Sequence, residues 1–150
     1  MRTAQQQLLP LIDRIVPIAC EQGLAELTEP ERTVYLAWCY SAEVCNGGHA
    51  QFFYNSTGAF AFETVEALLQ IGAPDFAKLL DRMIDIFPNR VVPKDLEERN
   101  HFLVSLVDQV HSWDNHPGRI LEESDAEFFR LTNESLMDRL LAYWKAQNAL

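Results

Sequence analysis

The stretch EVCNGGHAQFFYNSTG, from Glu43 to Gly58, is the most chemically varied part of the chain. It holds adjacent glycines, a histidine, several amide side chains and three consecutive aromatic residues. Adjacent glycines tend to end a helix, because glycine adopts left-handed backbone conformations without a steric penalty. We therefore expect a helix stop and a sharp reversal, with Asn46 in the left-handed conformation and a second short helix over 49–55.

The side chains around the glycines suit a tight corner. Gln51 and Asn55 lie one helical turn apart and can bond the loop backbone, while Glu43 can accept hydrogen bonds from the N–H groups of the glycine turn. Phe52 and Phe53 can anchor the short helix to the core. The residues assigned to this structural motif are Asn46, Gly47, Gly48, Gln51, Phe52, Phe53 and Asn55, together with Gly72, which ends a later helix.

The same stretch allows a functional interpretation. Its polar side chains could serve a small ligand or a reaction if they converged on a concave pocket; they are Glu43, Asn46, His49, Gln51 and Asn55. A nucleophilic Cys45–His49 dyad is disfavoured, because the glycines interrupt the helical spacing between the two residues. A phosphate site is also disfavoured, because no Lys or Arg occurs between Arg32 and Lys78.

Histidines and carboxylates later in the chain form a candidate metal site. It contains no HExxH motif and no Glu-x-x-His pair, and such residues in a polar loop are usually surface decoration. The sequence therefore predicts no metal, no cofactor and no catalytic residue. The cluster comprises His101, Asp108, His111, Asp114 and His116.

Helices account for most of the chain. Apolar residues recur every three or four positions, which is typical of amphipathic helices. Pro10 and Pro17 predict that the first helix is kinked or split, and the segment RVVP is too short for a strand. We expect one all-α domain over residues 1–150, with about seven or eight helices. The predicted spans are 4–22, 29–45, 49–55, 60–71, 75–87 and 95–112, a short helix from 124 and a last helix from 132.

Side-chain caps mark the starts of several of these helices. A capping box places a hydrogen-bond acceptor three residues before a Glu, so that each side chain bonds the backbone of the other. The predicted boxes are Thr28 with Glu31, Asp95 with Glu98, and Ser124 with Glu127, and Thr132 is predicted to cap the last helix.

The net charge, the apolar runs and the cysteines of the chain argue against several classes of function. The formal net charge is −10, and residues 15–77 hold eight acids against one base, Arg32. Phosphate binding depends on Lys and Arg, so this balance argues against direct binding to nucleic acid. No apolar run approaches the ~20 residues that span a bilayer, which argues against a membrane protein. The odd set Cys20, Cys39 and Cys45 contains no C-x-x-C pair and favours a cytoplasmic setting.

The chain resembles a bacterial domain-of-unknown-function family that contains a DNA-mimic protein. The resemblance lies in the motif E-x-x-N-G-G-x-x-Q-F-F-x-N, followed by Ile71, Gly72 and Ala73. The likeness extends over about residues 24–147 and departs at His49, where the family commonly has an aromatic residue. The resemblance implies an all-helical cytoplasmic fold and a homodimer. It also implies an acidic mimic that occupies the DNA-binding surface of a helix-turn-helix repressor.

A DNA mimic needs uncompensated carboxylates on a rigid surface, since duplex DNA presents dense phosphate charge. Glu63 and Glu66 lie one turn apart and are expected to have no nearby base, and Glu29 and Glu31 lie in the first turn of a helix. With Glu43 they form the predicted partner-binding surface. We therefore expect an acidic protein-interaction module that is not an enzyme and whose partner is a basic DNA-binding protein. The remaining alternative is a structural motif in a dimeric domain of other function.

Overall fold

The computed structural model describes residues 1–108 and 117–148. Within these residues the chain forms seven α-helices and three short 3-10 helices and contains no strand, which confirms the all-α prediction. The elements are α1 (Ala4–Gln22), η1 (Leu24–Glu26), α2 (Glu29–Tyr54), η2 (Ser56–Phe60), α3 (Ala61–Gln70), α4 (Pro74–Ile84), η3 (Pro88–Arg90), α5 (Leu96–Asp108), α6 (Pro117–Leu131) and α7 (Asn133–Gln147).

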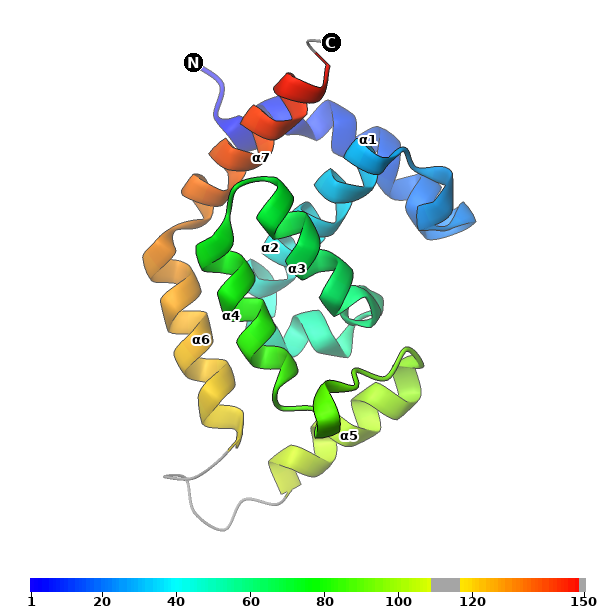
Figure 1. Ribbon diagram of the computed structural model, residues 1–150, viewed down its shortest axis with the longest axis vertical. Helices are drawn as coiled ribbons and strands as arrows, with labels where there is room; N and C mark the ends of the chain where they lie inside the picture. The colour runs from blue at the N-terminus through cyan, green and yellow to red at the C-terminus, as the bar shows by residue number, and fades with distance from the viewer. Residues whose placement is uncertain (109–116, 149–150) are drawn as a thin grey trace.

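Helix α2 forms the centre of the fold, where it contacts α1, α3, α5, α6 and α7. Helices α1 and α7 pack together at the end of the molecule that carries both termini, and α5 lies at the opposite end (Figure 1). Helices α3 and α4 form a hairpin over α2, and α6 runs along α4 and α2 (Figure 1). The helices that surround the Glu43–Gly58 stretch therefore all pack against α2.

The core beside α2 is rich in aromatic rings. Phe52 and Phe53 are fully buried, as the sequence predicts, and their ring centroids lie 5.2 Å apart in an edge-to-face arrangement. Tyr40 makes similar contacts with Phe52 and with Phe128 of α6, at 5.5 and 5.7 Å. Such edge-to-face pairs add to the free energy of burial and fix ring orientation. They join both segments of α2 to α6.

The prolines predict that the first helix is kinked or split, and the prediction of a split is wrong. Helix α1 runs unbroken from Ala4 to Gln22 and includes Pro10 and Pro17. Proline has no backbone N–H, so the carbonyls of Gln6 and Asp13, four residues before each proline, receive no helical hydrogen bond. Both prolines are exposed, and so are Gln6 and Asp13. Water can satisfy carbonyls on this face, so the missing hydrogen bonds do not break the helix.

Helix boundaries differ from the predictions at two further places. Helix α4 ends at Ile84, three residues before the predicted Phe87, which then closes a turn by donating its N–H to the Ile84 carbonyl. Helix α6 begins at Pro117, so the predicted Ser124 cap is wrong: Ser124 is buried in the middle of that helix. The caps at Thr28 and Thr132 are confirmed, as is the Asp95 acceptor for the Glu98 N–H.

An ion pair fixes the start of α4 against α7. Arg139 donates two hydrogen bonds to the carboxylate of Asp75, the longer being 3.1 Å, and its guanidinium lies over the Phe76 ring. Burial tends to raise the pKa of Asp75, but these hydrogen bonds more than offset it, so the pKa lies below its ordinary value. The ion pair therefore stabilises the fold above the pKa of the unfolded carboxyl and ceases to do so as pH falls through the folded pKa.

We expect Asp75→Asn to lower the free energy of unfolding by about 1–2 kcal/mol at neutral pH, because the guanidinium loses its charged acceptor. The difference from wild type should shrink below about pH 4, where the unfolded carboxyl also protonates. Urea denaturation followed by circular dichroism at several pH values measures both effects. Glu123→Gln removes the exposed pair of Arg119 and serves as control, with an expected cost below about 0.5 kcal/mol. A deficit for Asp75→Asn that is constant with pH would contradict the assignment.

Candidate functional site

The glycine pair breaks α2 as predicted, but the left-handed residue is Gly48 and not Asn46. Gly48 has φ 75° and ψ −176°, a conformation that side chains disfavour. A Cβ on Gly48 would also lie 2.2 Å from Oδ2 of Asp125 on α6, and one on Gly47 would lie 2.1 Å from Oε1 of Gln51. Close contacts therefore require glycine at both positions, and backbone geometry requires it at Gly48 as well.

The amide side chains of the motif bind Glu43 and not the loop backbone. Gln51 Nε2 and Asn55 Nδ2 donate to Oε2 of Glu43 at 2.8 and 2.7 Å. Glu43 is an acceptor, but the predicted partners are wrong: it bonds side-chain amides across the break and not the glycine N–H groups. This carboxylate clamp ties the two segments of α2 to each other.

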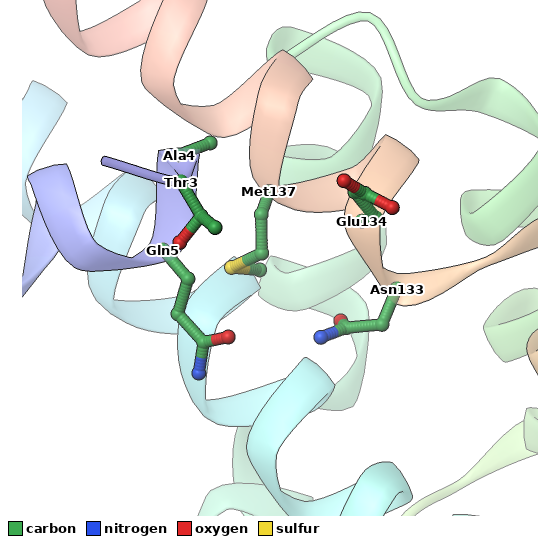
Figure 2. A pocket seen from close by; sticks show the side chains of 6 residues that line it. All are labelled: Thr3, Ala4, Gln5, Asn133, Glu134 and Met137. Carbon is green, nitrogen blue, oxygen red and sulfur yellow. The ribbon is translucent and has the colours of Figure 1, made fainter. Parts of the chain in front are cut away.

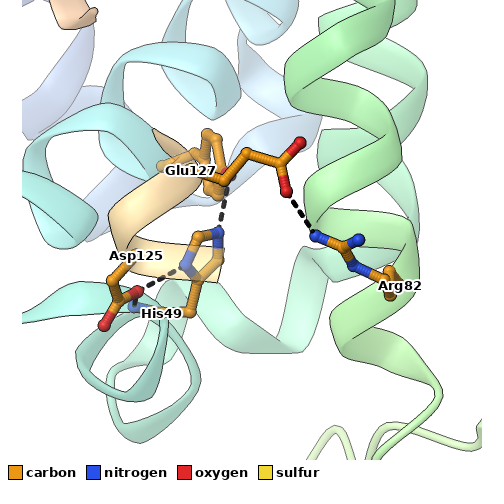
Figure 3. A network of polar contacts seen from close by, with 5 residues as sticks. His49, Arg82, Asp125 and Glu127 are labelled. Atoms are coloured by element: carbon orange, nitrogen blue, oxygen red, sulfur yellow. Dashed lines mark hydrogen bonds and ion pairs between the residues drawn. The ribbon is translucent and has the colours of Figure 1, made fainter. Parts of the chain in front are cut away.

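His49 fastens the corner to α6. Its backbone N–H and its ring Nδ1 both contact Oδ1 of Asp125, at 2.8 and 2.6 Å (Figure 3). Because a carboxylate can only accept, Nδ1 carries the proton. Figure 3 also shows the adjacent ion pair, in which Arg82 of α4 binds Glu127 at 2.8 Å. Asp125 and Glu127 of α6 thus join this helix to α2 and to α4.

The other ring nitrogen of His49 contacts the hydroxyl of Tyr40, and the Nε2–OH distance is 2.8 Å. Burial raises the pKa of Tyr40 well above its ordinary value, with a smaller contribution from the Asp125 charge, so the hydroxyl stays protonated. It can then serve as the hydrogen-bond donor to Nε2 of His49. The order carboxylate, imidazole, hydroxyl occurs in hydrolases, but the Tyr40 and His49 side chains are fully buried here. The geometry serves packing, with the imidazole in the place of the aromatic residue expected at this position.

A buried arginine completes the corner. Arg99 of α5 is fully buried and donates to the carbonyls of Phe53 and Asn55, each at 2.7 Å, and to those of Pro93 and Lys94. Burial lowers the pKa of Arg99, partly offset by the charge of Asp95. The carbonyls at the end of a helix carry partial negative charge, so a cation is favoured there. Arg99 therefore caps the end of α2 and holds α5 against it.

The predicted acidic residues separate into two groups. Glu29 of α2 and Glu63 and Glu66 of α3 line one groove of about 410 Å³. We call this the acidic groove; its other lining residues are Arg32, Thr33, Leu36, Ala67 and Gln70. A hydrogen bond of 2.7 Å from Thr33 to Gln70 joins its two walls. Within the described residues Glu29 and Glu66 form no salt bridge, so their charge is available to a partner.

The other two predicted acids do not line this groove. Glu31 closes the capping box with Thr28 and binds Arg14 at 2.7 Å. Burial tends to raise its pKa, but bonds from the Thr28 backbone and Arg14 leave the pKa below its ordinary value. Glu43 is occupied by the amide clamp described above. The inference that Glu63 lacks a nearby base is wrong, because the fold brings Lys94 to 3.1 Å from its carboxylate.

A smaller cavity of about 180 Å³ lies between the starts of α1 and α7. Figure 2 shows Gln5, Met137 and Asn133 around it, with the Glu134 carboxylate at its edge. The Asn133 side chain accepts a hydrogen bond from Ser41, so this amide serves to join α7 to α2. This cavity contains none of the residues singled out in the sequence.

The other sites considered from the sequence are the Cys45–His49 dyad and the candidate metal cluster. The Cys45–His49 dyad is not formed, since both ring nitrogens of His49 have other partners, and partial burial raises the pKa of the Cys45 thiol. Among the described residues no group of three potential metal ligands is found. Of the weighed metal cluster, the Asp108 side chain, His111, Asp114 and His116 lie outside the described residues. No helix in the described part of the chain is long and apolar enough to cross a membrane.

Sequence reasoning missed three residues that matter here: Asp125, Arg99 and Lys94. Arg99 lies four residues before buried Leu103, so its place on the apolar stripe of α5 was a readable signal. Asp125 lies in an acidic run without any local distinguishing feature, and Lys94 lies 31 residues from Glu63. Only the fold brings these two residues to their partners.

Comparison with protein families returns a match over most of the chain. The family model described as DMP19-like protein matches residues 25–148, which span α2 to α7 and leave out all of α1. Comparisons with curated proteins and with solved structures return no match.

We expect Gly48→Ala to lower the free energy of unfolding by about 3 kcal/mol or more, because it combines backbone strain with a collision at Asp125. Gly72→Ala is the matched control: Gly72 has φ 74°, but a Cβ there meets nothing within 4 Å. Its expected cost is the backbone strain alone, about 1 kcal/mol. Equal destabilisation of the two variants in urea melts would refute a role for the Asp125 contact.

Asp125→Ala is expected to cost about 2–3 kcal/mol, because it leaves the backbone N–H and the ring N–H of His49 without an acceptor. Glu122→Ala, at an exposed position on the same helix, is the control. In a His49→Phe background the Asp125→Ala cost should fall, since only the backbone N–H remains to be satisfied. An unchanged cost in that double-mutant cycle would show that the imidazole contributes nothing to the contact.

Proposed function

The chain belongs to the DMP19-like protein family, and on that premise we propose that it is an acidic protein-interaction module that mimics DNA. Its partner is a basic DNA-binding protein, such as a helix-turn-helix transcription regulator, whose DNA-binding surface it occupies. The protein acts in the cytoplasm as a homodimer, has no enzymatic activity or cofactor, and does not bind nucleic acid itself.

The acidic groove is the observation that supports this proposal. Glu29 comes from one helix and Glu63 and Glu66 from another, so the carboxylates converge through tertiary structure. Their helices are packed against each other, and this rigidity keeps the charges in place when a partner approaches. A surface that has evolved to bind the phosphates of DNA carries Lys and Arg, which such a groove can pair with.

Two cations near the acidic groove offset part of its negative charge. Arg32 lines it, but its guanidinium donates to the carbonyls of Leu24 and Leu27 and is held toward the chain before α2. Lys94 binds Glu63 while more than half of its side chain is exposed, so a partner's Lys or Arg can compete with it. Glu66 and Glu29 need no such exchange, and we assign them the larger part of the attraction.

The motif from Glu43 to Asn55 has a different role in this proposal. Its polar groups bond one another, Asp125 and Arg99, and this bonding keeps the corner rigid. The carboxylates of the acidic groove lie outside that network. Recognition of a partner is therefore assigned to the groove, and maintenance of the fold to the motif.

Affinity capture tests the proposal. Immobilised protein should retain a DNA-binding protein from a bacterial lysate at low salt and release it at high salt, because attraction between exposed charges is screened. In gel-shift assays the wild-type protein should displace DNA from the captured protein. The triple variant Glu29→Gln, Glu63→Gln and Glu66→Gln should require about tenfold more protein or greater for the same displacement.

A charge-matched triple variant is the control. Glu97→Gln, Glu122→Gln and Asp138→Asn remove three exposed acids from other helices and should leave displacement unchanged. Lys94→Gln, which frees the Glu63 carboxylate, should strengthen it. If the two triple variants weaken displacement equally, net charge and not the groove is responsible. If no captured protein binds DNA, the proposed mimicry is wrong.

A further inference from the structure

An exposed apolar pair lies beside the acidic groove on α3. The side chains of Phe62 and Leu69 are 42% and 55% exposed, although both are large and apolar. They are seven residues apart, which is two helical turns, and Glu66 lies between them on the same face. Glu66 also lines the acidic groove, so apolar surface and negative charge are continuous along this helix.

We propose that this face of α3, together with the acidic groove, binds a basic amphipathic helix of the partner protein. The apolar residues of that helix rest on Phe62 and Leu69, and its Lys or Arg side chains reach Glu66, Glu63 and Glu29. This inference rests on the proposed function, since it names the structural element of the partner that the groove receives.

Spacing favours a helical occupant. Two turns of α3 separate Phe62 from Leu69 by roughly 10.5 Å along the helix axis, at 1.5 Å per residue. A partner helix repeats its apolar side chains at the same interval, so positions i and i+7 match the pair. Its flanking positions then face the side of α3 that carries Glu66 and Glu63.

Charge favours a basic partner over a second copy of this chain. Two copies joined through α3 would bring Glu63 and Glu66 of each close to those of the other, and each chain carries a net charge of −10. Like charges brought together at an interface disfavour association. The homodimer of the proposed function therefore uses another face.

The apolar pair adds a property that carboxylates alone do not supply. Contacts between exposed charges weaken as salt screens them, whereas burial of apolar surface does not. Binding through both should fall with salt to a residual level that depends on Phe62 and Leu69. Binding through charge alone should continue to fall.

Two synthetic peptides test this inference on the full chain. One has leucines at i, i+4, i+7 and i+11 with Lys and Arg on the flanking positions, and the other has the same composition shuffled to remove the apolar face. We expect the amphipathic peptide to bind about tenfold more tightly in fluorescence anisotropy, as partial burial of two apolar side chains implies. Part of its binding should persist at high salt.

The double variant Phe62→Ser and Leu69→Ser should abolish this preference and the salt-resistant binding, while the shuffled peptide binds as before. Val104→Ser with Phe129→Ser removes exposed apolar residues from other helices and should change neither. Circular dichroism checks that each variant is folded. An unchanged preference in the Phe62/Leu69 variant would overturn the inference.

Substitution of the groove carboxylates distinguishes failure of the helix inference from failure of the proposed function. If Glu63→Gln with Glu66→Gln weakens both peptides but Phe62 and Leu69 have no effect, the groove binds basic partners and only the helix inference fails. If these Gln substitutions leave both peptides unaffected, the proposed function fails as well. Sedimentation velocity tests the competing occupant: a dimer that the Phe62/Leu69 variant converts to monomer would assign this face to a second copy and overturn the inference.

Discussion

The fold depends on the contact between the Asp125 carboxylate and residues 48–49. One carboxylate oxygen receives both the backbone N–H and the imidazole of His49, and the other fills the space that a Gly48 side chain would need. The contact is possible only because Gly48 takes a left-handed conformation, which turns the backbone N–H of His49 toward α6. A single acid thus sets the angle between the two segments of α2, the helix that most of the fold packs against.

The other polar contacts of the corner follow from this angle. Once the chain has turned, Gln51 and Asn55 face Glu43 on the preceding segment, and the last carbonyls of α2 face Arg99. Arg99 would be costly to bury alone, and the carbonyls at the end of α2 satisfy it. Glu43, Gln51 and Asn55 lie nearer the surface and satisfy one another. The corner is therefore a closed polar network around the aromatic core, which explains why so many chemically reactive residue types gather there without forming an open site.

The sequence predicted what is local and missed what is distant. Helix content, the break at the glycines and the Thr28 cap follow from spacing within a few residues. The start of α6 was missed because Ser124-x-x-Glu127 has the pattern of a cap, while burial against α2 and α4 places Ser124 inside a helix. Glu43 was correctly assigned as an acceptor, yet its donors could not be identified before the bend angle was known. The partners of His49 and Glu63 lie 76 and 31 residues away, and no periodicity encodes such pairs.

The same distinction separates the motif from the surface that we assign to binding. The corner is built from residues that bond each other, so a change in any one disturbs the others, and such interdependence makes a recognisable sequence signature. The groove acids have no such dependence: Glu29 and Glu66 form no salt bridge in the described part of the chain, and their position is set by the packing of α2 against α3. A related chain can therefore keep the corner and lose the acids, retaining the fold without the binding surface. In this chain the motif builds the corner, while we assign partner recognition to the charge and the exposed apolar residues that line α3.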